Sequence, residues 1–272
     1  MPSYVHPMPQ PLQPYVQSCV GYDYFLAPEA THHGLPSTAL TVIIAFDEPI
    51  DCGWLDGGPP SLFPTLLGGL HTRPTLIHTH GRQCGIQLSV TPAGSRALFG
   101  TPAGVFAGEI LDETHGLPAA VQRRLQDASW SERFRLLDDA LLARLARLDA
   151  HPMRREVAHA WARVHESAGR VRVEELADEV GLSRRRLLTE FRTEIGLTPS
   201  QARRVARFDR ARDLLKAGHS PADSAALAGY ADQPHLNRDW RALADMTPLE
   251  TLADFAVIEG PEDDPFVQDA IL

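Results

Sequence analysis

Arginine and side-chain amides stand at matching places in two segments of the C-terminal third of the sequence. The first segment has three consecutive arginines, 184–186, and the second has Gln233, Asn237 and Arg238. A guanidinium can donate two hydrogen bonds to the major-groove edge of guanine, and a primary amide can pair in the same way with adenine. Carried on helices, these side chains have the chemistry to contact DNA bases.

The residues around the first segment fit a helix-turn-helix. Ala177, Gly181 and Leu187 are the small, turn-forming and aliphatic residues that this motif needs, spaced by four and six positions. Ser183 is expected to cap the second helix. Leu187 and Phe191, one helical turn apart, are expected to face the core. The positions left facing outward are Arg184, Arg185, Leu188 and Thr189, of which the last two could contact a thymine methyl.

The second segment repeats the first at a nearly constant offset. Gly181 and Gly229 are 48 residues apart, so the second turn is one residue longer. A single motif of this kind arises by chance in alanine-rich helices, but two copies in register are a specific signal. The pairs separated by 49 residues are Ser183 and Asp232, Leu187 and Leu236, Phe191 and Trp240, and Thr198 and Thr247.

Base contacts are expected from the N-terminal half of each recognition helix. Arg185 and Arg238 suit a bidentate contact to guanine. Gln233 and Asn237 suit adenine. The alternative is that the arginine run is only a solvated helix face, which the register of the two copies disfavours. The outward positions of the second copy are Gln233, Pro234, Asn237 and Arg238.

One helix is expected between the two copies, over 199–217. Pro199 suits its first turn and Gly218 its end. About 19 residues at ~1.5 Å each give a helix of roughly 28 Å, and successive major grooves lie about 34 Å apart. This linker could place the recognition helices, about 183–194 and 232–243, in neighbouring grooves. Arg203, Arg204 and Arg207 on the linker are candidates for phosphate contacts, with simple surface coverage as the alternative.

These motifs resemble the AraC/XylS-type transcription regulators, over about 152–255. The resemblance implies double-stranded DNA as partner. Gly69–Arg73 and Gly85–Gly94 resemble the N-terminal domain of a mostly actinobacterial subgroup, which implies a cupin-like sensing or dimerising domain. Relatives usually have Gly where this chain has Asp245, so we expect strain at that helix end. The matching motifs are Leu176-Ala177, Gly181 to Ser183, Arg186-Leu187, Phe191-Arg192, Gly196 to Pro199, Arg207 to Leu215, Gly229 to Gln233 and His235 to Arg238.

Length and composition agree with a two-domain protein. The 272 residues can bury two cores, and 43% hydrophobic with 22% charged residues is ordinary. The net charge of −9 comes from outside the expected DNA-binding region, because residues 153–250 hold 17 basic and 15 acidic residues. Phosphate binding needs positive charge only where the phosphates lie. The absence of an apolar span or a signal peptide, and three scattered cysteines, favour a cytoplasmic protein with no membrane partner.

The N-terminal part changes from a strand-like to a helical pattern. Short apolar runs between Gly and Pro residues predict strands at 38–46, 75–80 and 85–90, and a turn-rich loop at 51–60. Apolar residues spaced by three or four predict a helix from Phe134 to Leu148, with Ser131 as its N-cap. A shorter helix is expected before it, over 119–128. The longer helix could pack on the strands, form a homodimer, or do both. Residues 1–14 are rich in Pro and are expected to be extended or loose. The predicted fold is α+β: a β-rich cupin-like domain over 15–150, an all-α domain over 153–257, and an acidic tail over 258–272.

A rival chemistry rests on His78 and His80. On a strand these two share a face, as in metal-binding cupins, so the alternative function is a cupin-type metalloenzyme or metal sensor with an appended DNA-binding domain. The Glu expected four residues later is replaced by Cys84. We therefore expect no metal ligand, no cofactor and no catalytic residue, and a protein that is not an enzyme. Trp54 and Phe63 could line an effector cavity or fill a core, which leaves a small-molecule effector open.

Overall fold

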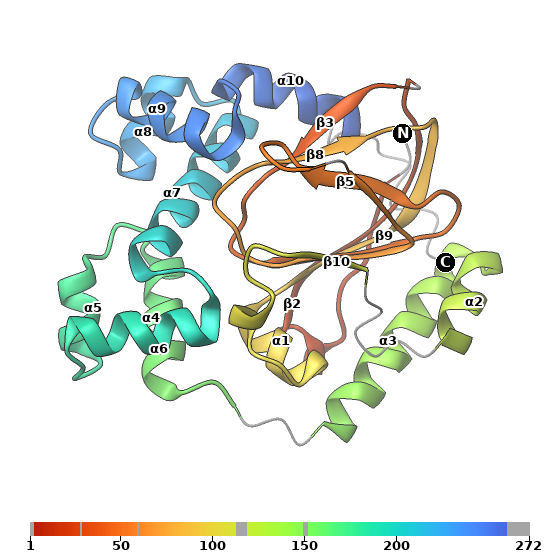
Figure 1. The fold of residues 1–272 in the computed structure, drawn as a ribbon, viewed down its shortest axis with the longest axis horizontal. Coiled ribbons are helices and arrows are strands. Elements are labelled where there is room, and N and C mark those ends of the chain that lie inside the picture. Colours follow the sequence, from red (N-terminus) through yellow and green to blue (C-terminus); the bar gives the residue numbers. More distant parts are fainter. Residues whose placement is uncertain (1–2, 28, 59, 113–118, 149–151, 260–272) are drawn as a thin grey trace.

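The computed structural model describes residues 3–27, 29–58, 60–112, 119–148 and 152–259 (Figure 1). A β-rich region occupies one side of the molecule, and the C-terminal helices cover the other side as an upper and a lower group. This arrangement confirms the α+β prediction. No helix within the described residues is long and apolar enough to cross a membrane.

The strands of the described region form two antiparallel sheets, as a sandwich requires. The six-stranded sheet has the order β1 (Ser3–Val5), β2 (Val16–Phe25), β9 (Arg82–Val90), β4 (Leu40–Ala45), β7 (Thr65–Gly68) and β10 (Ile110–Asp112). The four-stranded sheet has the order β3 (Thr31–Gly34), β8 (Thr75–His78), β5 (Ile50–Trp54) and β6 (Ser61–Phe63).

Strand β4 shows why the central runs of the sequence are almost wholly apolar. Ile43 belongs to the cluster between the two sheets, with Tyr22, Ile50 and Phe63. Its neighbours Val42 and Ile44 point to the opposite face of the sheet, because strand side chains alternate. That outer face packs against helices, so β4 is buried on both sides.

One sequence expectation for this region is wrong in part, and another is decided between its two alternatives. Residues 51–60 are not all loop, since β5 extends to Trp54 and pairs with β6 and β8. Of the two alternatives for residues 1–14, the extended one holds at β1, which pairs with β2, and a 3₁₀ turn, η1 (Gln10–Leu12), places Leu12 in the core. Gly and Pro mark turns, but they do not say where a short strand between them begins.

Helices cover the outer face of the large sheet. They are α1 (Pro92–Phe99), η2 (Ala103–Val105), α2 (Ala119–Asp127) and α3 (Trp130–Arg147). The N-cap of α3 is Ser129, not Ser131: the Ser129 backbone N–H donates to Glu132 Oε2 at 3.1 Å, in a capping box. Leu137 and Leu141 of the expected stripe are buried beneath α3.

The C-terminal region contains two consecutive three-helix units. The first comprises α4 (Arg155–Glu166), α5 (Val173–Glu179) and α6 (Arg184–Ile195). The second comprises α7 (Pro199–Lys216), α8 (Pro221–Ala228) and α9 (Gln233–Ala244), followed by α10 (Pro248–Glu259). Helix α7 runs between the lower and the upper group of helices in Figure 1. The expected boundary residue His151 and most of the expected tail, 260–272, lie outside the described residues.

The first unit is joined closely to the β-rich region. One buried apolar cluster extends from the large sheet through α1 and α3 to α4, α5 and α6. Arg96 of α1 donates from Nε and Nη2 to the two carboxylate oxygens of Glu194 on α6, both at 2.7 Å. A Cβ atom at Gly104 would lie 2.3 Å from the carbonyl oxygen of Thr193, so η2 touches the end of α6 because residue 104 is glycine.

The second unit has a separate core. Its buried residues come from α7, α8 and α9, with Phe208 and Trp240 at the centre, ring centroids 4.6 Å apart. Polar contacts to Asp209 of α7 and to Asp254 of α10 connect this part of the chain to the β-rich region. The backbone N–H of Thr38 donates to Asp209 Oδ2 at 3.0 Å, and that of His33 donates to Asp254 Oδ2 at 3.0 Å.

Candidate nucleic-acid interface

The two turns have the backbone geometry that the sequence predicted. Gly181 and Gly229 both have a left-handed conformation, with φ of 67° and 84°. At the start of α6, Ser183 Oγ accepts from the backbone N–H of Arg186 at 3.3 Å. At the start of α9, Asp232 Oδ1 accepts from the backbone N–H of His235 at 2.6 Å. Both predicted N-caps are confirmed, and they fix where each recognition helix begins.

The predicted anchors hold both helices in their units. Leu187, Phe191, Leu236 and Trp240 are all fully buried. Trp240 Nε1 also donates to Thr251 Oγ1 at 2.8 Å, which ties α9 to α10. Since the anchored face of each helix is buried, the opposite face is the one that can meet a ligand.

That opposite face carries the predicted reading residues. All of these residues are exposed except Asn237 of α9, which is half-buried. The Oδ1 atom of Asn237 has no hydrogen-bond partner among the described residues. On α6, Thr189 Oγ1 donates to the carbonyl oxygen of Arg185 at 3.0 Å, which leaves its methyl group as the outward contact. The exposed members are Arg184, Arg185, Leu188, Thr189, Gln233, Pro234 and Arg238.

The arginines of this face differ in their partners. Arg184 is paired with Glu174 of α5 at 2.9 Å, and Arg186 with Glu190 one turn along α6 at 2.8 Å. Within the part of the chain that the structure describes, Arg185 and Arg238 have no ion pair and no side-chain hydrogen bond. These two guanidinium groups are therefore available to a new acceptor. The sequence favoured Arg185 and Arg238 for guanine, but it did not predict that Arg184 is paired with Glu174.

The three linker arginines are not equivalent either. Arg203 Nε donates to the carbonyl oxygen of Gly169 at 3.2 Å. Arg204 forms an ion pair through Nε with Asp239 of α9. The Arg207 guanidinium lies 5.1 Å from the centre of the Tyr230 ring. Each one already has a structural contact, and a phosphate contact stays a prediction for all three.

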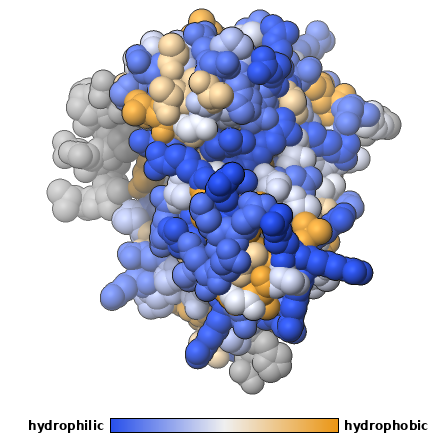
Figure 2. All heavy atoms as spheres, turned by 90° about the vertical axis from the view of Figure 1, so that its left-hand side faces the viewer, coloured by the Kyte–Doolittle hydropathy of each residue, from blue (hydrophilic) through white to orange (hydrophobic). Residues whose placement is uncertain are grey.

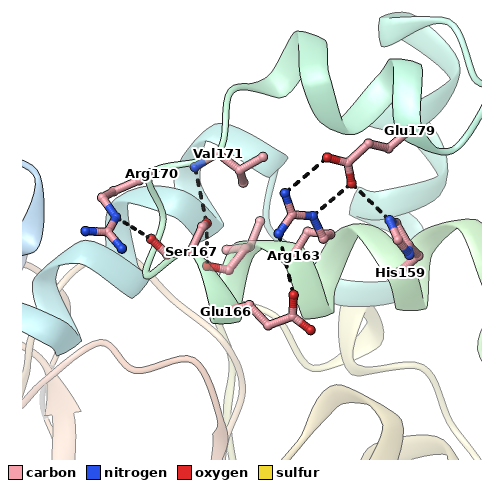
Figure 3. A network of polar contacts seen from close by, with 8 residues as sticks. His159, Arg163, Glu166, Ser167, Arg170, Val171 and Glu179 are labelled. Atoms are coloured by element: carbon pink, nitrogen blue, oxygen red, sulfur yellow. Dashed lines mark hydrogen bonds and ion pairs between the residues drawn. The ribbon is translucent and has the colours of Figure 1, made fainter.

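A polar network positions α5 against α4 (Figure 3). Arg163 Nε and His159 Nε2 approach the same oxygen of Glu179, at 2.9 and 3.0 Å. Arg163, followed by His159, lowers the pKa of the Glu179 carboxyl. At the turn before α5, Ser167 Oγ accepts from the backbone N–H of Val171 at 3.2 Å. Sequence reasoning missed this network, because Glu179 lies on another helix than His159 and Arg163 and at no fixed spacing from them.

The surface over the helical domain is polar. Figure 2 shows this side with mostly hydrophilic side chains, several of them long and projecting, and only scattered hydrophobic patches. Exposed Leu188 on α6 is an apolar element within it, 44% accessible. Together with the exposed arginines of α6 and α9, this polar face suits a charged, hydrated partner.

His78 and His80 do not lie on one strand, although the metal-site alternative required this. His78 ends β8, whereas His80 lies beyond the strand and its Nε2 is 2.8 Å from Asp51 Oδ2. Among the described residues, no group of three or more His, Cys, Asp or Glu side chains is placed to hold a metal ion. Phe63 lies in the core between the sheets, and Trp54 packs against Arg73, whose guanidinium is 4.0 Å from the indole centre.

The C-terminal region is similar in sequence to known helix-turn-helix proteins. Residues 176–254 match the family model of a helix-turn-helix domain. The HTH-type transcriptional regulator YbfI of Bacillus subtilis is 33% identical over 69 residues, which is a quarter of this chain and a quarter of that relative's length.

The fold of nearly the whole chain is similar to that of ToxT from Vibrio cholerae. One ToxT structure has a TM-score of 0.55 at 12% identity, over 87% of this chain and 98% of that one. Another, bound to an unsaturated fatty acid, has a TM-score of 0.55 at 11% identity, over 86% and 94%. The two-domain fold is shared with ToxT. Residues 176–254 of this chain are similar to the helix-turn-helix domains that the family model describes.

Proposed function

We propose that the chain is a sequence-specific transcription regulator that inserts α6 and α9 into successive major grooves of one DNA duplex. The observation that carries the proposal is the pair of in-register units, each with a buried anchor face and an unpaired outward arginine, Arg185 or Arg238. A free guanidinium on an exposed helix face can make the bidentate contact to guanine. A protein that acts on DNA would work in the cytoplasm of a bacterial cell.

The linker helix supports the spacing. Helix α7 has 18 residues, and at ~1.5 Å per residue it is about 27 Å long. Successive major grooves on one face of B-DNA are about 34 Å apart. Helix α9 packs beside α7, through Phe208 and Trp240, so the spacing of the recognition helices is not set by the length of α7 alone.

Control by a small-molecule effector is the second part of the proposal. One structure of ToxT holds an unsaturated fatty acid, and this chain shares the ToxT fold. In this chain the β-rich domain and the first unit share one apolar core. A ligand that repacked the β-rich domain would therefore act on α6 directly. Association of two copies through α3 remains a further part of the proposal.

Selection from genomic DNA tests the proposal. The purified chain is mixed with fragments of its own genome, and the retained fragments are sequenced at two salt concentrations. We expect a shared motif of two half-elements about one helical turn apart, with binding that weakens as salt rises. Retention of fragments with no shared motif, at either salt concentration, contradicts sequence-specific reading.

The metalloenzyme alternative needs its own measurement. The purified chain is analysed for bound transition metals, and the His78→Ala and His80→Ala variants serve as matched controls. A regulator of the proposed kind contains no stoichiometric metal that depends on these two residues. One metal per chain, lost in both variants, would favour the alternative.

A further inference from the structure

Each recognition helix carries a carboxylate directly before its aromatic anchor. Glu190 precedes Phe191 on α6, and Asp239 precedes Trp240 on α9, again 49 residues apart. Both carboxylates face an arginine from the first helix of their own unit. Arg154, at the N-cap of α4, pairs with Glu190 at 3.3 Å, and Arg204 of α7 pairs with Asp239.

The contact in the second unit joins three elements. Asp239 Oδ1 accepts from Arg204 Nε of the linker helix, and Asp239 Oδ2 accepts from the hydroxyl of Tyr230 at 3.2 Å. Tyr230 follows the turn glycine, Gly229, between α8 and α9. Arg204 Nη2 also reaches the Asp239 backbone carbonyl at 3.4 Å. Both carboxylate oxygens are used, and the side chain of Asp239 is only 12% exposed.

The corresponding contact in the first unit uses only one carboxylate oxygen and exposed arginines. Glu190 shares one oxygen, Oε1, between Arg154 and Arg186, and the side chains of these two arginines are 58% and 63% exposed. The first recognition helix has other supports, because its C-terminal end is held by Arg96 and η2. Among the described residues, the second recognition helix makes no direct contact of this kind with the β-rich region. Its contacts with the linker helix include those of Asp239 with Arg204 and of Trp240 with Phe208.

We propose that Asp239 is the positioning residue that fixes the angle between α9 and the linker helix, and through it the spacing of the two half-elements that the protein accepts. This inference rests on the proposed function. Apolar packing around Trp240 holds α9 in place but has little directional preference. A charge-assisted contact that uses both carboxylate oxygens defines direction. Asp239 faces inward to Arg204 and Tyr230, so it acts through α9 and not by touching DNA.

The first test compares spacing profiles. The motif found by genomic selection is prepared with one base pair removed or added between the half-elements, and the isolated second half-element is prepared as well. For the wild-type protein, each change of spacing should weaken binding roughly tenfold or more, since a single lost base contact already costs about 5- to 150-fold. For Asp239→Asn and Arg204→Gln, the same change should weaken binding less than about threefold.

Asp245→Asn is the matched control. It removes the same charge from the end of the same helix, and the Asp245 side chain is exposed. Its spacing profile should equal that of the wild type. Tyr230→Phe removes one hydroxyl and keeps the ring, so its profile should fall between the wild type and Asp239→Asn. Binding to the isolated half-element should be unchanged in Asp239→Asn.

A second test needs no DNA. Spin labels at Arg192→Cys on α6 and Arg241→Cys on α9, both exposed positions, report the distance between the recognition helices. The three natural cysteines are buried. We expect a single narrow distance distribution in the otherwise wild-type chain and in Asp245→Asn, and a broader one in Asp239→Asn.

The outcomes separate the inference from the proposed function. An unchanged distance distribution, or an unchanged spacing profile at lower affinity, in Asp239→Asn overturns the positioning role. Failure of the wild-type protein to select any motif overturns the proposed function alone, because the label distances still decide whether Asp239 fixes α9. Loss of half-element binding in Asp239→Asn would make it a contact residue and would also overturn the inference.

Discussion

Arg185 and Arg238 differ from the arginines beside them because no carboxylate neutralises them among the described residues. We expect Arg185→Ala and Arg238→Ala each to cost about 1–3 kcal/mol of specific binding and to relax the base preference at one position. Arg184→Ala is the matched control: Glu174 already neutralises Arg184, so its loss should cost less. Titration against the selected motif and its single-base variants measures both effects. Equal losses in all three variants would show that the arginines act only as charge.

Asp245 is the residue where the second copy departs from the first, and the expected strain is present. It has φ of 57° at the end of α9, where Gly196 ends α6 with φ of 90°. A left-handed conformation costs a non-glycine residue about 1–2 kcal/mol, somewhat less for Asp. Asp245→Gly should therefore raise the free energy of unfolding by up to about 1 kcal/mol.

Gly218→Ala is the opposite substitution, because it adds a side chain at a residue with a left-handed conformation. Gly218 has φ of 84°, and no atom lies within 4 Å of an added Cβ, so only the backbone term changes. We expect a loss of about 1 kcal/mol. Urea unfolding of the two variants and the wild type measures both numbers. A loss of stability in Asp245→Gly would mean that the carboxylate has a stabilising role.

At the level of elements, the sequence predicted the helical domain well and the β-rich domain in part. Helices carry local signals: Ser183 and Asp232 as caps, Gly181 and Gly229 in the turns, and a regular apolar spacing. Short strands such as β5 and β6 are defined by their pairing partners, β8 among them, which no local pattern contains. The same limit applies to the site. The outward positions of a helix follow from its periodicity. The ion pair of Arg184 does not, because its partner Glu174 lies on another helix.

Strand β3 gives the molecule a pH-dependent element. Burial lowers the pKa of His32 to about 4; nearby His33 adds to this and Asp254 opposes it. The folded pKa lies below the ordinary 6.5, so the unfolded chain binds the proton first and stability falls as pH decreases from about 6.5 to 4. From pH 7 to 5 the loss due to His32 is at most about 2 kcal/mol.

The His32→Gln variant isolates this contribution, because other groups titrate equally in both proteins. Urea unfolding at pH 7 and pH 5 should show a smaller decrease for the variant, by up to about 2 kcal/mol. His219→Gln is a control at an exposed histidine. An identical decrease in the wild type and in His32→Gln would show that His32 is protonated in the folded protein.

At the scale of the whole molecule, the two reading units are supported in different ways. The first shares its apolar core with the β-rich domain, whereas the second has a core of its own. A change in the β-rich domain therefore reaches α6 through packed side chains but reaches α9 mainly through α7, Asp209 and Asp254. For effector control, this asymmetry predicts that a ligand changes the position of α6 first.

The joint between α1, η2 and α6 is the place to test that asymmetry. Glu194 and Arg96 are 8% and 20% exposed, and removing one partner of a buried pair leaves the other charge unpaired, at a cost of about 3–5 kcal/mol. Glu194→Gln should therefore destabilise the chain and speed hydrogen exchange in 92–108 and 184–196 before the rest. Gly104→Ala should do the same by steric means, because its Cβ would meet a backbone carbonyl. Gly58→Ala, with no atom within 4 Å of an added Cβ, should leave exchange unchanged. Faster exchange spread evenly over α4–α9 in Glu194→Gln would instead mean that both units open together, and that the β-rich domain supports them as one body.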